Sequence, residues 1–129
     1  MTMAKQLVRA ALRRLHSPDA IDLRSFRHSD SANFGILIQA MIGPAEAEGE
    51  ESFAFMLVTP QWIARELQTR DSRWGRSTLI VSRYAYETLE RAVLALCDRA
   101  EGDSWSQVAE ILNRSMTWEF EDYREPEEP

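Results

Sequence analysis

Cysteine is almost absent from this chain of 129 residues, which contains only Cys97. A single cysteine excludes an intramolecular disulfide and a cysteine-based metal cage, and it is typical of a reducing compartment. Long apolar runs are absent as well. The longest one, at 34–43, is interrupted by Gln39 and is shorter than the ~20 residues that span a bilayer. Arginines also interrupt the N-terminal region where a signal peptide needs a continuous apolar stretch. These absences predict a soluble, cytoplasmic protein without a membrane segment.

Motifs of common enzyme chemistries are missing too. The chain has no glycine-rich phosphate loop and no GxSxG nucleophile elbow. His16 and His28 flank a turn without metal-ligand spacing, so we predict that both are solvated. Cys97 falls near the C-terminal end of a predicted helix, where the helix dipole raises the pKa of a thiol. We therefore predict a buried structural cysteine, and we predict no catalytic residue, metal or cofactor.

Charge is unevenly distributed along the chain. Residues 1–35 carry six Lys/Arg and three Asp/Glu, a balance of +3, and the remainder carries nine against eighteen, a balance of −9, which together give the net charge of −6. An acidic balance argues against a nucleic acid partner, because phosphate contacts need clustered Lys and Arg. It favours docking onto a basic protein.

Apolar periodicity and turn residues predict alternating strands and helices. Residues 5–16 are ambiguous, because Val8, Ala10 and Leu12 alternate as in a strand while alanine, leucine and arginine favour a helix. An irregular connection is expected at 19–32. Strands are predicted at 34–42, 52–58, 77–81 and 116–123, and helices are predicted from 60, at 86–100 and from 105.

The helix ends have recognisable signals. Thr59 before Pro60 predicts an N-cap, and Ser104 with Gln107 fits a capping box. Gly102 is expected to end the preceding helix in the left-handed conformation. On the helices, Trp62 and Trp105 lie on apolar faces and are predicted to be core residues.

These elements predict one domain at 1–124 of the α+β class. Its expected architecture is an antiparallel or mixed sheet of about five strands, with about three helices packed on one side. Residues 125–129 contain only proline and glutamate. Such a segment cannot bury apolar surface, so we predict a disordered tail.

Two acidic clusters are the candidate binding features. One lies in the loop between two predicted strands, and the other lies in the last predicted strand. The candidate partner-binding residues are Glu46, Glu48, Glu50, Glu51, Glu119, Glu121 and Asp122. Such clusters are consistent with a solvated surface or with an acidic recognition surface. In a strand, Glu119 and Glu121 would project from one face about 7 Å apart, which would also suit a pair of catalytic acids or a hard-metal site.

A loop tryptophan lies among arginines in the middle of the chain. Trp74 follows Arg73 and precedes Arg76 by two positions, and we expect it to be exposed. Such residues can stack on nucleic acid bases. The net charge of −6 argues against this interpretation.

Several motifs together resemble the immunity protein 8 family of bacterial polymorphic toxin systems. They are the hairpin at 33–44 with Gly-Glu-Glu-Ser-Phe at 49–53, Glu-Gly-Asp-Ser-Trp at 101–105 and Trp-Glu-Phe-Glu-Asp-Tyr at 118–123, with turn signals at 17–19 and 59–62. The resemblance covers residues 8–123. It implies an α+β fold whose first segment is a strand. The family's signature residues correspond to Gly43, Glu50, Gly102, Trp105, Trp118, Glu119 and Asp122.

The resemblance also implies a function. Such a protein is an antidote, encoded beside a toxin gene, that binds and blocks the toxin's C-terminal effector domain. Many of these toxins are nucleases with basic active sites, which would suit the acidic clusters. The resemblance gives no catalytic residues, and we expect a monomer or a weak homodimer. Two alternatives stay open: a small enzyme built on Glu119, Glu121 and a histidine, and an adaptor domain without a toxin partner.

Overall fold

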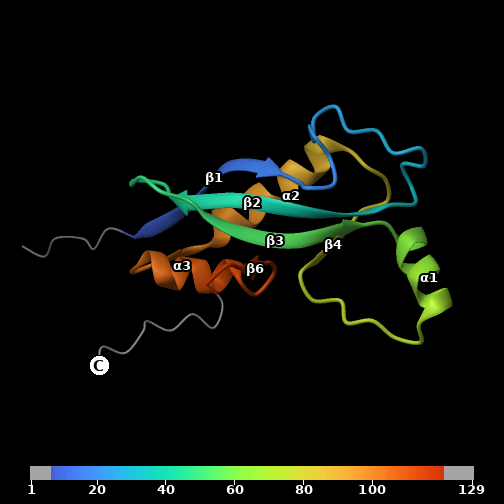
Figure 1. Cartoon of the computed structure of the whole chain (residues 1–129). Helices are drawn as coiled ribbons and strands as arrows, with labels where there is room; N and C mark the ends of the chain where they lie inside the picture. Colours follow the sequence, from blue (N-terminus) through green and yellow to red (C-terminus); the bar gives the residue numbers. More distant parts are fainter. Residues whose placement is uncertain (1–6, 121–129) are drawn as a thin grey trace, which may run out of the picture.

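The computed structural model describes residues 7–120, which form three helices and a mixed sheet (Figure 1). In chain order the elements are β1 (Val8–His16), β2 (Gly35–Pro44), β3 (Glu51–Val58), α1 (Pro60–Thr69), β4 (Thr78–Ile80), α2 (Tyr86–Arg99), β5 (Glu101–Gly102), α3 (Trp105–Leu112) and β6 (Thr117–Trp118). This confirms the predicted α+β class and the predicted order of elements, to which β5 is added. The tail predicted at 125–129 lies outside the described residues.

Three long strands form the centre of the sheet. The strand order is β4-β3-β2-β1-β5, and β1, β2 and β3 pair antiparallel. Two short strands share the outer edge of β3, because β6 pairs antiparallel with Phe53 and Ala54 while β4 pairs parallel further along. They meet where the hydroxyl oxygens of Ser77 and Thr117 are 2.7 Å apart in a hydrogen bond. The sheet is therefore mixed.

A bulge in β1 explains why its sequence is ambiguous. Arg13 is the extra residue where the pairing of β1 with β2 shifts register. Val8, Ala10 and Leu12 pack against the core before the bulge, and Leu15 packs there after it. Because strand side chains alternate with a period of two, one extra residue moves the apolar set from even to odd positions. The resemblance therefore correctly predicts a strand where helix propensity does not.

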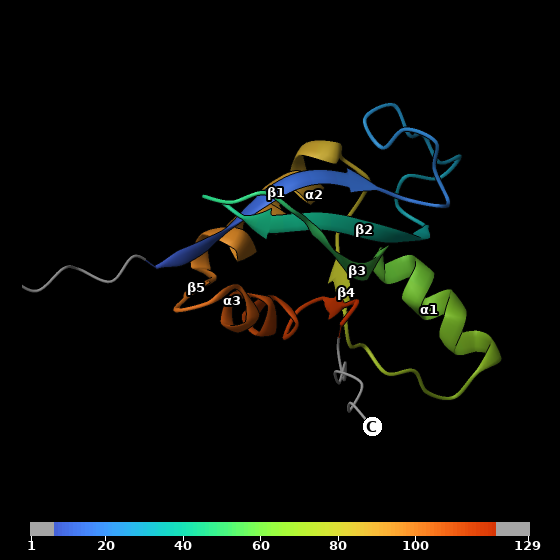
Figure 2. The ribbon, with the colours of Figure 1, turned by 60° about the vertical axis from the view of Figure 1, so that its left-hand side comes forward.

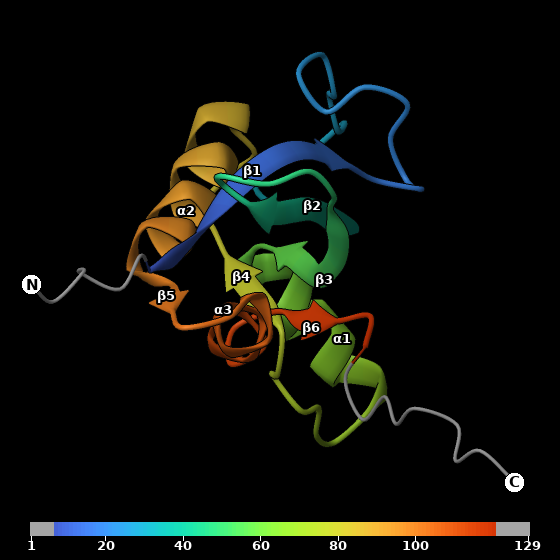
Figure 3. The same cartoon turned by 90° about the vertical axis from the view of Figure 1, so that its left-hand side faces the viewer.

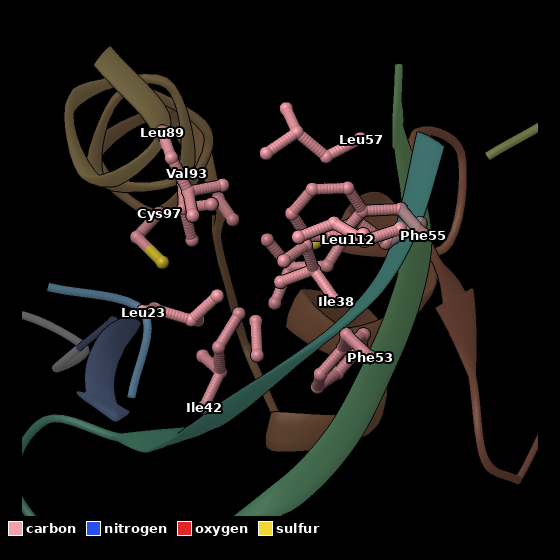
Figure 4. Close-up of a cluster of buried hydrophobic side chains, with 14 of the residues drawn as sticks. Leu23, Ile38, Ile42, Phe53, Phe55, Leu57, Leu89, Val93, Cys97 and Leu112 are labelled. Atoms are coloured by element: carbon pink, nitrogen blue, oxygen red, sulfur yellow. The ribbon is translucent and has the colours of Figure 1, made fainter. Parts of the chain in front are cut away.

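The hydrophobic core lies between one face of the sheet and two helices. In Figure 3, α2 and α3 lie on the same side of β2 and β3. Leu89, Val93 and Cys97 point inward from α2, and Leu112 does so from α3 (Figure 4). The strands contribute every second residue, as a half-covered sheet requires. The buried strand residues on this face are Ile36, Ile38, Ala40, Ile42, Phe53, Phe55 and Leu57.

Helix α1 begins just after β3 ends and projects away from the sheet (Figure 2). Gly35 and Val58 pair across β2 and β3 between core-facing positions, so they point away from the core. The indole ring of Trp62 occupies the space beside Gly35, where a Cβ atom would overlap it. Val58 is buried without belonging to the core cluster. The prediction that Trp62 is a core residue is therefore wrong, and no residue of α1 is buried.

The predicted N-caps are confirmed, and one predicted helix end is wrong. Thr59 and Ser104 each accept a hydrogen bond from a backbone N–H three residues later, at 3.4 and 3.2 Å. Helix α2 does not end in a left-handed glycine. Its C-cap is Ala100 with φ −96° and ψ 103°, and Gly102 pairs with Val8 in β5.

Candidate partner-binding surface

The acidic loop, defined here as residues 45–50, joins β2 to β3. Glu46 and Glu48 are exposed, and neither makes a hydrogen bond or an ion pair with another residue in 7–120. Arg13, the bulge residue of β1, holds the loop backbone. Its Nη2 donates to the carbonyl oxygens of Pro44 at 2.7 Å and Ala47 at 2.9 Å. The loop therefore presents two carboxylates that have no partner among the described residues, from a backbone that Arg13 holds.

The carboxylate of Glu50 forms an ion pair with Arg14 of β1. Its Oε1 lies 2.8 Å from Nη2 of Arg14 in a surface ion pair. Exposed pairs of this kind stabilise a fold by about 0–1 kcal/mol. Glu50 can therefore exchange Arg14 for a cation on a partner at little cost to the fold.

Glu51 serves the fold. Its side chain is half-buried on the core side of β3. One carboxylate oxygen accepts from the indole Nε1 of Trp105, and the other accepts from Nε1 of Trp118 at 2.9 Å. Trp118 also stacks on Phe53, with ring centroids 6.4 Å apart and an interplanar angle of 8°. A single carboxylate thus ties α3 and β6 to β3.

Glu119 also makes internal hydrogen bonds. Its Oε1 accepts from the backbone N–H of Ser52 at 2.7 Å, and its own N–H donates to the carbonyl of Ser52 at 3.0 Å. This extends the pairing of β6 with β3 by one residue. The structure thus brings Glu119 to the start of β3, beside the acidic loop. Glu121 and Asp122 lie outside the described residues.

The sheet face opposite the core connects the acidic loop to α1. Strand alternation places Leu37, Gln39 and Met41 of β2 on this face, and each is half-exposed. The acidic loop folds back over one end of the face, where the carbonyl of Gly49 sits against Gly43. Figure 1 shows this loop and α1 at opposite ends of the strands. We call this surface the open face.

The arm, defined here as residues 60–77, comprises α1 and the connection to β4. Trp74 is 95% exposed, Leu67 is 43% exposed, and Ile80 just beyond the arm is 56% exposed. These side chains border a hollow of about 100 Å³ together with Trp62 and Val58. The exposed position of Trp74 agrees with our expectation. The sequence does not identify Trp62 as part of this hollow, because its position on an apolar helix face predicts a core residue.

The two histidines lie on the surface and are not gathered into a metal site. His16 ends β1 and is exposed, and His28 is exposed in the long connection, where its Nδ1 lies 3.1 Å from the N–H of Asp30. Within residues 7–120, no group of three or more His, Cys, Asp or Glu residues is arranged to hold a metal ion.

Cys97 lies in the core, as predicted, with 3% of its surface exposed. Burial, with a smaller contribution from the nearby carboxylate of Asp98, raises the pKa of its thiol to about 11. The thiolate is the reactive form of cysteine, so this residue is poorly suited to be a nucleophile.

The raised pKa of Cys97 predicts that its thiol reacts slowly with disulfide reagents in the folded protein. At pH 8 we expect a disulfide reagent to react with native protein at least about a hundredfold more slowly than with protein in denaturant. The unfolded thiol ionises around its ordinary value of 9.0 and the folded thiol only near 11. The stability that comes from the neutral thiol is therefore complete below pH 9 and declines between pH 9 and 11. Stopped-flow thiol titration checks the rate. Equal rates in the two states would contradict the burial of Cys97.

A mostly apolar cleft lies on the helical side of the sheet. It has a volume of about 360 Å³ and runs between α2, β4 and the turn before β6. Its described lining includes Phe55, Leu79 and Leu96, with Arg99 as a charged residue. A nucleophile paired with a base is not present among the described residues that line it.

These features define a small α+β domain whose exposed charged and aromatic groups suit contact with another protein. The protein-family model for Immunity protein 8 matches residues 10–123. Because the match covers most of the chain, the chain belongs to the immunity protein 8 family, which consists of immunity proteins directed against toxins. Searches of curated proteins and of solved structures found no match. Within residues 7–120, no helix has both the length and the apolar character that a bilayer crossing requires.

Proposed function

We propose that this protein neutralises the C-terminal effector domain of a toxin encoded beside its own gene, by forming a one-to-one complex with that domain in the cytoplasm. The family match over residues 10–123 carries the proposal. The chemistry of the described residues supports binding over catalysis. Glu119, which the rival enzyme hypothesis needs, bonds to the backbone of Ser52.

The acidic loop is the proposed contact for a basic region of the toxin. Glu46 and Glu48 are exposed and unpaired within 7–120, and Glu50 is held only by a surface ion pair. Carboxylates of this kind raise the rate of encounter with a cationic partner and disfavour wrong partners. Glu51 and Glu119 contribute indirectly, because their hydrogen bonds hold the base of the loop. Glu121 and Asp122 remain proposed contacts from the sequence.

Co-expression tests the proposed function. The C-terminal domain of the neighbouring toxin is produced with an affinity tag, together with the untagged chain. We expect the chain to co-purify at one to one and to restore growth of cells that make the toxin domain. If the chain neither binds nor protects, this toxin is not its partner, and the proposed function fails.

Charge reversal tests the acidic loop. In the double variant Glu46→Lys with Glu48→Lys, the association rate with the toxin domain should fall roughly tenfold at low salt and should become less sensitive to salt. The melting temperature should not change, because neither side chain has a partner within the part of the chain that the structure describes. Stopped-flow or surface-based kinetics measure the rate.

A matched control separates the loop from overall charge. Asp98→Lys with Glu110→Lys changes the net charge by the same amount, at exposed positions on α2 and α3. This control should change the association rate much less than the loop variant. Equal slowing by both double variants would show that net charge, and not the loop, governs encounter.

A further inference from the structure

We infer that the arm is a second contact for the same toxin domain, with Trp74 as an anchor that enters an apolar recess bordered by carboxylates. This inference rests on the proposed function. It concerns the end of the open face that lies opposite the acidic loop. It deepens the proposal by naming the anchor residue and the chemistry that the partner must present there.

The arm exposes large apolar side chains to solvent. Trp74 is 95% exposed, although burying an indole is among the most favourable contacts that a protein can make. Leu67 and Ile80 are also exposed and border the same hollow. Scattered apolar residues on a surface are ordinary, whereas a contiguous group marks an interaction site. Tryptophan and arginine are also the residues most enriched among binding hot spots.

The arm does not need these side chains to fold. Helix α1 is amphipathic but has no buried residue, so the described chain covers its apolar side chains only in part. Both ends of the arm are held to the sheet, because the indole of Trp62 packs against Gly35 and the carbonyl oxygen of Ser77 accepts from the backbone N–H of Met56 at 2.9 Å. Within the arm, the guanidinium of Arg73 lies 4.9 Å from the Trp62 ring centroid. Trp74 takes part in none of these contacts, so it is available to a partner.

The positive charge of the arm indicates which kind of partner surface can bind it. Four arginines and two carboxylates lie between residues 60 and 77, a balance of +2 in a chain with a net charge of −6. Arg65 borders an open hollow of about 320 Å³ on α1, beside Trp62. Arginine forms paired hydrogen bonds with carboxylates. A partner that receives Trp74 should therefore carry carboxylates around its recess.

The two ends of the open face together fix the orientation of the partner. The acidic loop lies over Gly43 at one end of β2, and Trp62 lies over Gly35 at the other end. The strand β2 has ten residues, which corresponds to about 33 Å at ~3.3 Å per residue, within reach of a single toxin domain. Opposite charges at the two ends favour one docking direction and disfavour the reverse. The same domain thus meets carboxylates at one end and arginines with an indole at the other.

The test compares Trp74→Ala with Leu94→Ala in binding to the C-terminal domain of the neighbouring toxin. Leu94 is 42% exposed on α2, on the far side of the sheet from the arm. Trp74→Ala should raise Kd about 30-fold or more, the effect of a hot-spot residue, mainly through faster dissociation. Leu94→Ala should leave Kd within about twofold. Both variants should melt at the wild-type temperature, because the replaced side chains are exposed.

The possible results distinguish a failure of the proposed function from a failure of the arm as a contact. If the wild-type chain does not bind the toxin domain, the proposed function fails and this inference fails with it. If the wild-type chain binds and Trp74→Ala binds equally well, only the arm is excluded as a contact. Sedimentation of the free chain tests whether a second copy of this chain binds the arm in place of the toxin domain. Self-association that Trp74→Ala abolishes, with toxin affinity unchanged, would assign the arm to a second copy and overturn the inference.

Discussion

Replacing Glu51 with alanine is expected to lower the free energy of unfolding by about 2–4 kcal/mol. The carboxylate accepts hydrogen bonds from the indole N–H groups of Trp105 and Trp118. Alanine removes both acceptors and leaves two partly buried donors without partners. Each unsatisfied donor costs about 1–3 kcal/mol. Urea unfolding followed by tryptophan fluorescence measures the change, because two of the four tryptophans, Trp105 and Trp118, lie at the site.

The neighbouring residue provides the control for Glu51. Glu50→Ala removes the same carboxylate one position earlier, but it breaks only an exposed ion pair with Arg14. Its expected cost is below about 1 kcal/mol. Glu51→Gln should fall between the two variants, since the amide oxygen replaces one acceptor and the amide nitrogen cannot replace the other. Equal costs for Glu50→Ala and Glu51→Ala would show that the indole hydrogen bonds do not stabilise the fold.

The motifs that carry the family resemblance therefore report mainly on the fold. Gly43 lacks a Cβ atom and so leaves room for the backbone of the acidic loop. Trp105 and Trp118 both donate to Glu51, and Glu119 accepts from Ser52. Each of these contacts gathers the chain around the first half of β3. This explains how short, scattered motifs identify the architecture without identifying the partner. The groups that we assign to partner contact, in the acidic loop tip and the arm, fall mostly outside those motifs.

Local signals predict the elements well, and they fail where a long-range contact decides the outcome. Thr59 and Ser104 cap their helices as predicted, because a cap depends on residues close in sequence. The local sequence does not determine what Trp62 packs against. The apolar stripe of α1 looks the same whether the helix packs on the core or, as it does here, against the open space beside Gly35. The same limit applies to Gly102. It lies in β5, where it pairs with the distant Val8 of β1, and it does not end α2.

The acidic clusters show the same limit at the candidate site. A sequence can show that Glu46, Glu48, Glu50 and Glu51 are close together, but not which of them has a partner within the fold. Strand alternation and the distant Trp105 decide that Glu51 points inward. The bulge at Arg13 decides which backbone carbonyls hold the loop. The sequence thus predicts the acidic region, and the structure separates the glutamates that have partners within the fold from those that are exposed.

Gly43→Ala is expected to lower the free energy of unfolding by about 2–4 kcal/mol, as overpacking against rigid backbone does. A Cβ atom at this position would overlap the carbonyl oxygen of Gly49. A backbone carbonyl cannot rotate aside as a side chain can, so the acidic loop must move as a unit. That movement stretches the hydrogen bonds from Arg13 to Pro44 and Ala47. Urea unfolding measures the loss of stability.

Gly75→Ala is the matched control, because a Cβ atom at Gly75 meets no atom within 4 Å. Its stability should be unchanged or higher by up to about 1 kcal/mol, since alanine restricts the unfolded chain. The pair of variants also tests how fold and binding are connected. Gly43→Ala keeps every carboxylate but displaces Glu46 and Glu48, so its association with the toxin domain should slow although the net charge is unchanged. Wild-type association in a destabilised Gly43→Ala protein would show that the position of the loop is unimportant, and encounter would then depend on charge alone.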